Sequence, residues 1–357
     1  MNKPIVGITM GDPAGNGPEI TVKALAHSDL YDRCRPLVVG DAKILEQAAG
    51  FVDRTDIHIH RCEQVSDALF VPGTIDVLHL ELIPDVAAFP IGQVSVEGGN
   101  AAFQCVRKVI QLAMDGQVDA TCTNALNKEA MNKALEAANG ANSDGYTHFD
   151  GHTEIYATYT NTKKYTMMLA HHDLRVVHVS THCSLREACD RVKKARVLEV
   201  IQIAHKACVD MGIENPRVAV AGLNPHCGEN GMFGTEEIEE IQPAIDEALA
   251  EGINIPEKKP TPPDTVFSKA LGGWYDIVVV MYHDQGHIPL KVKGFVYNKQ
   301  EKHWEAVAGV NVTLGLPIIR ASVDHGTGFG HAGSGHANEL SLINAMDYGI
   351  RLAENKK

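Results

Sequence analysis

The chain lacks several features that would place it in a particular class of protein. Its apolar stretches stay well short of the roughly 18 residues that a membrane-spanning helix needs, so no membrane partner is expected. Its eight cysteines show no CxxC pair and no regular spacing, which is typical of a reducing compartment. Residues 1–10 run straight into a strand-like segment without the apolar core of a signal peptide. These absences together predict a cytoplasmic protein.

Positive charge is scarce as well. The chain has 32 Lys and Arg residues against 45 Asp and Glu, a formal net charge of -13. Such a balance argues against nonspecific binding to nucleic acid, so no nucleic-acid partner is predicted. It does not exclude a small anionic substrate, because a local cluster of basic groups can reverse the field inside one cleft.

Nucleotide-binding signatures and internal repeats are also missing. The glycine-rich segment 11–19 follows a strand-like run and precedes a helix with Pro18 in its first turn. It matches neither GxGxxG nor GxxxxGK[ST]. Its backbone N–H groups could bind an anion, or the segment could be a tight turn in which Asp12 bonds its own backbone. Both interpretations remain open.

What the sequence does contain is an alternation of strand-like and helix-like segments, which predicts an α/β fold with a largely parallel sheet. Helical periodicity is clearest at 97–114, 195–211, 235–251 and 339–355. A domain boundary is expected near residue 135, because 137–150 is small, polar and rich in turn formers. The apolar runs expected to form buried strands are 5–10, 36–40, 118–122, 165–170, 174–180, 217–221, 277–282 and 317–323.

Three histidines follow three of these predicted strands: His182, His226 and His283. Ligands of open α/β sheets collect outside the carboxyl ends of the strands. Three neutral imidazoles there would bind one divalent metal and leave a coordination position open for substrate. The alternative is that these are ordinary polar loop histidines, since the chain has 18.

Basic residues lie near several of the same turns. Arg320 is the most informative, because a guanidinium inside an apolar strand needs a partner, either a substrate anion or a structural salt bridge. Lys128 and Lys291 also follow predicted strands. The run Gly151-His-Thr-Glu154 could be an active-site segment or a helix cap.

Two further segments could take part in catalysis. The stretch 324–338 is a long glycine-rich loop, which favours contact with a cofactor over a flexible connection. Asp264, in Pro-Pro-Asp-Thr, could be a helix N-cap or an active-site carboxylate.

Taken together, these motifs resemble the 4-hydroxythreonine-4-phosphate dehydrogenase family and its paralogues, over nearly the whole chain. The family implies an α/β fold like isocitrate and isopropylmalate dehydrogenases, with two α/β/α domains and a central cleft. Residues 1–135 with 311–357 would form the cofactor-side domain, and 136–310 the metal-binding and dimerisation domain. The motifs are Gly7-Ile-Thr-Met-Gly-Asp-Pro-Ala-Gly, Gly151-His-Thr-Glu, Thr181-His, Gly222-Leu-Asn-Pro-His-Cys-Gly-Glu, Pro263-Asp-Thr, Tyr282-His-Asp-Gln-Gly, Asn311-Val-Thr-Leu-Gly-Leu-Pro and Ala332-Gly-Ser-Gly.

The resemblance also implies roles for individual residues. His182, His226 and His283 would bind one divalent metal, zinc or else magnesium, manganese or cobalt, at a site completed across a homodimer interface. NAD would bind on irregular loops, and Asp264 and Lys128 are the candidates for proton transfer. The substrate contacts would be His152, Thr153, Lys291, Asn311 and Arg320, and the cofactor contacts Gly326, Thr327, Gly333, Gly335 and Asn338.

Two departures from the biosynthetic enzymes bear on the substrate. The segment between Lys291 and Asn311 is longer and predicts a small hairpin around Asn298, and Thr181-His-Cys-Ser-Leu replaces a more apolar stretch. Both favour the paralogues that oxidise and decarboxylate 4-phospho-D-threonate or 4-phospho-D-erythronate to dihydroxyacetone phosphate. The alternatives are 4-hydroxythreonine-4-phosphate oxidation in pyridoxal phosphate biosynthesis, a three-histidine metal hydrolase, or a non-catalytic binder of phosphorylated acids.

Overall fold

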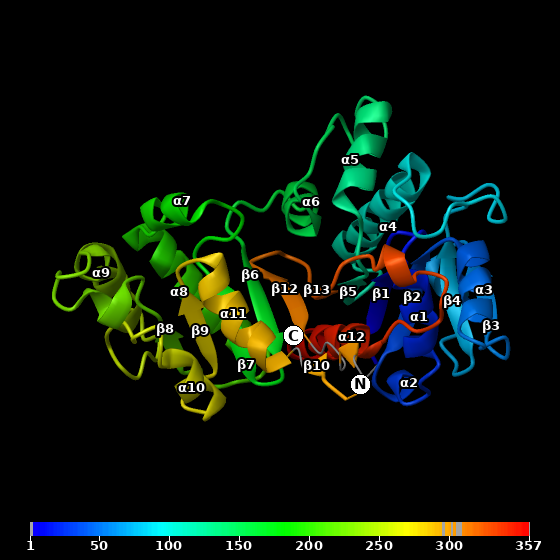
Figure 1. Ribbon diagram of the computed structural model, residues 1–357. Coiled ribbons are helices and arrows are strands. Elements are labelled where there is room, and N and C mark those ends of the chain that lie inside the picture. Colours follow the sequence, from blue (N-terminus) through cyan, green and yellow to red (C-terminus); the bar gives the residue numbers. More distant parts are fainter. Residues whose placement is uncertain (1–2, 295–296, 301–302, 305–308, 357) are drawn as a thin grey trace. The chain divides into compact units, whose positions relative to one another are not determined.

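The computed structural model describes residues 3–294, 297–300, 303–304 and 309–356. They form two compact units (Figure 1). The first unit runs up to Lys163 and includes Leu316–Asn355, and the second is Lys164–Gly315. Each unit, with its own strands and helices, is described by itself below.

The sheet of the first unit has the strand order β3-β4-β2-β1-β5-β13, and the pairs along it are parallel. The strands inside this order are short and mostly buried, as expected where both faces of a sheet are covered, whereas β3 at its end is largely polar and only partly buried. Their bounds are β1 Ile5–Thr9, β2 Arg35–Gly40, β3 His58–Cys62, β4 Thr74–His79, β5 Ala120–Thr123 and β13 Arg320–Val323.

Helices cover this sheet through their apolar sides. The longest is α4 (Val96–Met114), which Ser95 caps by accepting the N–H of Gly98 and which buries Phe103, Val106 and Val109. The others are α1 Gly17–Leu25, α2 Leu30–Arg33, α3 Ala42–Phe51, α5 Lys128–Ala137, α6 His152–Tyr159 and α12 Leu340–Asn355, with 3-10 turns at Val65–Asp67 and Phe329–His331.

The chain leaves the first unit later than the sequence predicted. Residues 136–163 belong to this unit, so the change comes after Lys163 and not near residue 135, and the chain returns at Leu316. The reason is packing of this segment against α4, where Arg107 donates to both carboxylate oxygens of Asp144. Phe149 also stacks on Phe103, with ring centroids 5.9 Å apart. The polar, turn-rich composition of 137–150 reflects a connection inside the unit.

The second unit has a mixed sheet of order β12-β6-β7-β9-β8. Its strands β12, β6 and β7 pair antiparallel, whereas β7, β9 and β8 are parallel, so the expected parallel arrangement holds for only part of this sheet. The strand bounds are β6 Thr166–His171, β7 Leu174–His178, β8 Val218–Val220, β9 Ile277–Val280 and β12 Val310–Leu314.

Helices and a small hairpin complete this unit. The predicted hairpin is confirmed as the antiparallel pair β10 (Tyr297–Asn298) and β11 (His303–Trp304), although residues 301–302 of its turn lie outside the described part. The helical segments are α7 Leu185–Asp190, α8 Lys194–Asp210, a 3-10 turn η2 Pro225–Gly228, a π-turn η3 Glu237–Ile241, α9 Gln242–Ala250, α10 Val266–Leu271 and α11 His283–Gly294.

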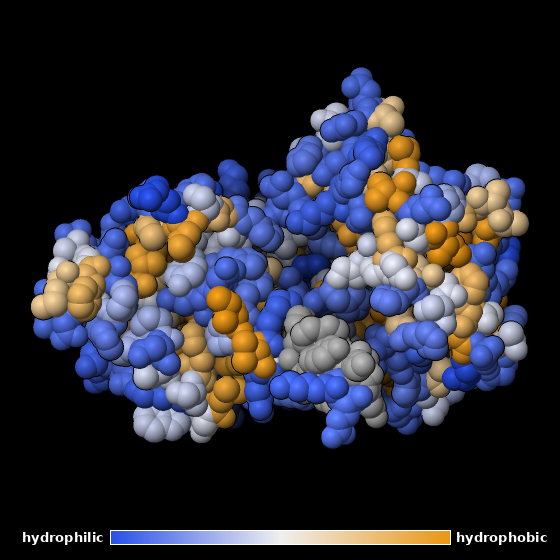
Figure 2. Space-filling model, viewed as in Figure 1, coloured by the Kyte–Doolittle hydropathy of each residue, from blue (hydrophilic) through white to orange (hydrophobic). Residues whose placement is uncertain are grey.

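The surface carries small apolar groups separated by hydrophilic ones. Figure 2 shows one such group along α11, where Ile288 and Val292 are 59% and 76% exposed. These residues are four apart, so they share one face of the helix. In the described ranges, none of the helices has both the length and the apolar character that a membrane crossing requires.

Candidate active site

The three predicted metal ligands follow three adjacent strands of the second unit. Strands β7, β9 and β8 are neighbours and run parallel, so their carboxyl ends lie along one edge of the sheet. His182 comes shortly after β7, His226 lies in the turn after β8, and His283 is the first residue of α11 after β9. The topology therefore brings all three segments to the same sheet edge.

Four imidazoles gather at that edge. The rings of His182 and His283 lie 5.9 Å apart between centroids. His287 stacks on His283 at 3.5 Å with an interplanar angle of 11°, and His178 lies 4.8 Å from His287. Sequence reasoning missed His178 and His287. The spacing of His283 and His287, one helical turn apart, was the available signal for the second.

His178 is fully buried and neutral. Burial lowers its pKa to about 3. Its Nδ1 lies 3.1 Å from the Met167 carbonyl oxygen, and in the described ranges its Nε2 is buried without a hydrogen-bond partner. A Cβ on Gly286 would lie 2.7 Å from that Nε2, so only glycine fits beside the ring. This ring can therefore serve as a neutral acceptor at physiological pH.

His226 lies on a strained turn. His226, Cys227, Glu229 and Asn230 have positive φ angles of 51°, 56°, 43° and 56°, which non-glycine residues rarely adopt. The buried carboxylate of Glu237 secures this turn. Glu237 Oε1 accepts the N–H groups of Leu223 and Asn224, both at 2.7 Å, and Oε2 accepts the Asn224 amide at 2.9 Å.

The structure brings two of the three predicted ligands together. His226 is exposed, and in the described part of the chain no ring contact joins it to His182 or His283. Among those same residues, one group of possible ligands has its atoms all within 4.8 Å of one another, namely His60, Cys62 and Asp76 of the first unit. The donor chemistry of the three histidines suits a divalent metal, and their convergence stays a prediction.

Asp264 lies close to the turn that carries His226. It is exposed in the turn before α10, where Thr265 is the N-cap residue, so the helix-cap alternative is wrong. Burial, and then the negative charges of Glu237 and Asp264, raise the pKa of the Cys227 thiol to about 11.

A second set of predicted residues surrounds Arg320 in the first unit. Arg320 is only 2% exposed on β13, its Nη2 donates to Thr123 Oγ1 at 3.0 Å, and its guanidinium lies 5.7 Å from the centroid of the Tyr156 ring. Tyr156 in turn donates to Thr121 at 2.9 Å. Burial lowers the pKa of Arg320 to about 10, which leaves it charged at neutral pH.

His152 and Lys128 are near Arg320. Burial, followed by the positive charges of Arg320 and Lys128, holds the pKa of His152 well below its usual range. Its Nε2 is buried without a hydrogen-bond partner in the described part. A Cβ on Gly151 would lie 3.4 Å from Lys128 Cε. A buried guanidinium and an exposed ammonium group near a neutral imidazole form a setting that attracts a phosphate or carboxylate.

The remaining predicted substrate residues are divided between the units. Thr153 is in the first turn of α6, next to His152. Lys291 is half-buried on α11 of the second unit. Asn311, on β12, donates to the Met167 sulfur at 3.0 Å, and its Oδ1 is buried without a partner in the described ranges.

Most of the glycine-rich loop packs on its own unit. Glu19 accepts the N–H groups of Gly333 and Gly335, and Lys23 Nζ donates to the Gly335 and Ala337 carbonyls at 3.1 and 2.6 Å. A Cβ on Gly335 would lie 2.3 Å from the Phe51 carbonyl oxygen. These glycines are therefore required by the protein itself.

The rest of the loop is tied to the segment 11–19. The Asn16 N–H donates to the Thr327 carbonyl at 2.8 Å, and Asp12 accepts the Ala14 N–H at 2.9 Å, so the tight-turn interpretation of that segment is confirmed. Gly326 has no atom within 4 Å of an added Cβ, which leaves its backbone accessible. Asn338 Oδ1 accepts the N–H of Leu340 at the start of α12.

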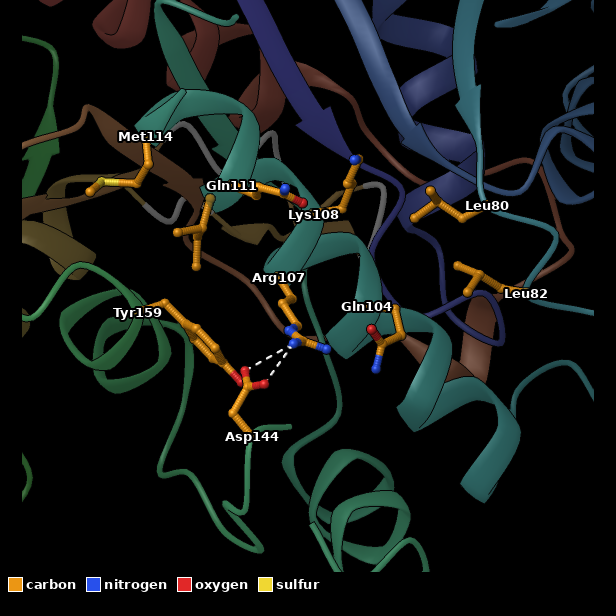
Figure 3. A pocket seen from close by; sticks show the side chains of 10 residues that line it. Leu80, Leu82, Gln104, Arg107, Lys108, Gln111, Met114, Asp144 and Tyr159 are labelled. Carbon is orange, nitrogen blue, oxygen red and sulfur yellow. Dashed lines mark hydrogen bonds and ion pairs between the residues drawn. The ribbon is translucent and has the colours of Figure 1, made fainter. Parts of the chain in front are cut away.

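A separate cavity of about 690 Å³ lies beside α4 (Figure 3). Its wall includes Leu80, Leu82, Lys108 and Tyr159, and none of the predicted site residues. Arg107 closes part of it by donating to both Asp144 oxygens, at 2.8 and 2.9 Å. The charges of Arg107 and Asp144 in the wall of this cavity therefore compensate each other.

The geometry defines an α/β protein with an imidazole cluster at the carboxyl edge of three strands of the second unit and a cationic cluster around the buried Arg320 in the first unit. Comparison with known proteins identifies its family. Residues 32–349 match the family of the pyridoxal phosphate biosynthetic protein PdxA, and the chain belongs to this family.

Similar proteins cover almost the whole chain. It is 43% identical over 354 residues to D-threonate 4-phosphate dehydrogenase of Cupriavidus necator, with 99% of this chain and 98% of that protein aligned. The solved 4-hydroxythreonine-4-phosphate dehydrogenase of Burkholderia phymatum is 44% identical, with 99% of each chain covered and a TM-score of 0.81. The Klebsiella pneumoniae enzyme of the same name is 39% identical, with 98% of this chain and 100% of that chain covered and a TM-score of 0.83. The chain is thus an oxidoreductase of the dehydrogenase type.

Proposed function

We propose that this protein catalyses the NAD-dependent, metal-dependent oxidation and decarboxylation of 4-phospho-D-threonate or 4-phospho-D-erythronate, giving dihydroxyacetone phosphate and carbon dioxide. The single observation that carries this proposal is the placement of His182, His226 and His283 at the carboxyl edge of three adjacent parallel strands. The names of the relatives support the substrate class.

His182, His226 and His283 would bind the divalent metal. When bound, such an ion lowers the pKa of a coordinated alcohol and stabilises negative charge on a neighbouring oxygen. The three ligands have to be neutral to bind it. The ring of His178, 6.3 Å from that of His283, is buried and neutral at physiological pH.

Asp264 is the proposed general base. Its carboxylate is exposed near the turn that carries His226, where it can remove the proton of the substrate hydroxyl as the hydride leaves for the nicotinamide. Lys128 is the proposed acid. Its ammonium group can return a proton to the carbon from which carbon dioxide departs.

Arg320, Lys128 and His152 supply the anion-binding set. Arg320 offers a planar fork of donors and His152 a neutral ring beside it, which suits the phosphate or carboxylate of the substrate. Thr153, Lys291 and Asn311 would add donors that fix which carbon faces the nicotinamide. The accessible backbone at Gly326, with the neighbouring Thr327 side chain, is the best candidate contact for NAD, with Gly333, Gly335 and Asn338 shaping the loop.

The confirmed hairpin β10–β11 supports the sugar-acid substrates over 4-hydroxythreonine 4-phosphate, since the longer segment is the feature that set this chain apart. Self-association is part of the proposal. The exposed pair Ile288 and Val292 lies on the helix that begins with His283, so a partner subunit covering it would adjoin the metal ligands. Light scattering at the protein concentration used in the activity assay tests the proposed self-association. A monomer under these conditions would contradict it.

The test is NADH formation with 4-phospho-D-threonate, 4-phospho-D-erythronate and 4-hydroxythreonine 4-phosphate assayed in parallel, with release of carbon dioxide measured alongside. Turnover should be fastest with one of the two sugar acids, should stop after chelation and should return with zinc, manganese, magnesium or cobalt. His226→Ala should lose the metal and turnover, whereas the control His205→Ala on α8 should keep both. Full activity of the metal-free protein would refute the scheme.

A further inference from the structure

A group of possible metal ligands lies in the first unit, apart from all residues assigned above. His60 and Cys62 are on β3 and Asp76 is on β4, and one ligand atom from each lies within 4.8 Å of the others. His60 Nδ1 is 2.7 Å from Asp76 Oδ1 and 3.6 Å from Cys62 Sγ. Cys62 and Asp76 are buried, and the His60 side chain is partly open to solvent.

Strand register creates this group. β3 and β4 pair parallel with His60 opposite Asp76, so the two side chains share one face of the sheet. His58, His60 and Cys62 alternate along β3 and therefore share that face too. The His58 ring lies 6.3 Å from that of His60. The alternation His-x-His-x-Cys and this register together place the group on one face. A shift of the pairing by one residue would put Asp76 on the opposite face from the β3 side chains.

Asp76 is held in a fixed orientation. Its Oδ1 accepts the N–H of Leu69 at 3.0 Å and its Oδ2 that of Phe70 at 2.7 Å. Backbone donors of this kind orient the carboxylates that bind metals in proteins. The His60 ring lies against the same carboxylate, on its partly exposed side.

We propose that His60, Cys62 and Asp76 bind a divalent metal ion of the zinc type, which ties β3, β4 and the segment 63–70 together. Nitrogen, sulfur and carboxylate donors are the combination that zinc binds in proteins, in tetrahedral sites. His58 or a water molecule would supply the fourth ligand. Such a site is structural and independent of the proposed reaction.

Cobalt titration of the metal-free, full-length protein tests the proposal, because thiolate bound to Co²⁺ gives a charge-transfer band in the near ultraviolet and imidazole does not. The wild-type protein should develop this band once enough cobalt is present to fill both this site and the proposed three-histidine site, and zinc should abolish it. Cys62→Ser should lack the band. The matched control Cys227→Ser, which removes a half-buried thiol of the second unit, should keep it.

His60→Gln provides a second variant, since this side chain is partly exposed and its replacement should leave the fold intact. It should weaken cobalt binding at least about tenfold. Absence of the band in the wild type, or its persistence in Cys62→Ser, would overturn the proposal and identify the group as a hydrogen-bonded anchor of the segment 63–70. Dehydrogenase activity is not needed for either readout, so a failure here would leave the proposed function untouched.

Discussion

Replacing Arg320 by methionine separates its two possible roles, because substrate binding and folding should respond differently. Burial of the guanidinium lowers its pKa to about 10, which corresponds to a penalty of about 3 kcal/mol on the charged form. Methionine removes that penalty. It also removes the hydrogen bond to Thr123, about 1 kcal/mol, and the contact with Tyr156, about 1–2 kcal/mol. The free energy of unfolding should therefore change by no more than about 1 kcal/mol.

Binding of the substrate should change far more. Losing a buried cation that pairs with an anionic ligand costs about 2–5 kcal/mol, which is roughly a 30-fold or greater fall in kcat/KM. Arg320→Lys keeps the charge and loses the planar fork, so its kcat/KM should lie between those of the wild type and of Arg320→Met.

Steady-state NADH formation with 4-phospho-D-threonate measures the change in kcat/KM. Urea unfolding monitored by circular dichroism measures the change in the free energy of unfolding. A variant that loses several kcal/mol of stability while its KM is unchanged would refute the reasoning. Arg320 would then be a structural ion-pair residue.

Two further predictions concern pH and the glycine-rich loop. Since the pKa of His152 is lowered in the folded protein, its contribution to stability is present above about pH 6.5 and is lost as the pH falls, by up to about 1.4 kcal/mol per pH unit. His152→Gln should lessen that slope in urea unfolding at about pH 7.5 and about pH 5.5, and an unchanged slope would show that His152 does not titrate this way. Gly335→Ala should destabilise the chain by about 1–3 kcal/mol, because its Cβ meets the Phe51 carbonyl at a φ of +72°. Gly326→Ala, with open space around its Cβ, should leave stability unchanged and raise the KM for NAD; an unchanged KM would remove Gly326 from the cofactor site.

Local patterns predicted much of the fold. The strand-like runs before His182, His226 and His283 are real strands, and the periodic segments 97–114 and 195–211 are α4 and α8 nearly to the residue. These strands and helices depend on the spacing of apolar residues within one segment, and this spacing can be read directly from the sequence. The hairpin around Asn298 followed in the same way from turn residues between short runs.

What the sequence could not supply depends on packing between distant segments. The boundary near residue 135 was wrong because the contacts of Phe149 with Phe103 and of Asp144 with Arg107 hold 136–163 on the first unit, and neither contact leaves a local signature. The His178 ring was missed because its special property, a neutral state caused by burial at the end of a strand, cannot be read from the sequence around it. The glycines of 333–335 suggested a close approach, and the structure shows that their neighbours are Glu19 and Phe51.

The Glu237 carboxylate has a consequence for how the protein matures. Left-handed non-glycine residues cost roughly 1 kcal/mol or more each, so the segment around His226 would relax in isolation. Its shape exists only once η3 has docked and Glu237 has captured the two amides. The turn should therefore become able to bind a metal ion through His226 late during folding, and should lose this ability early during unfolding. Metal occupancy would then report whether the turn around His226 is correctly folded.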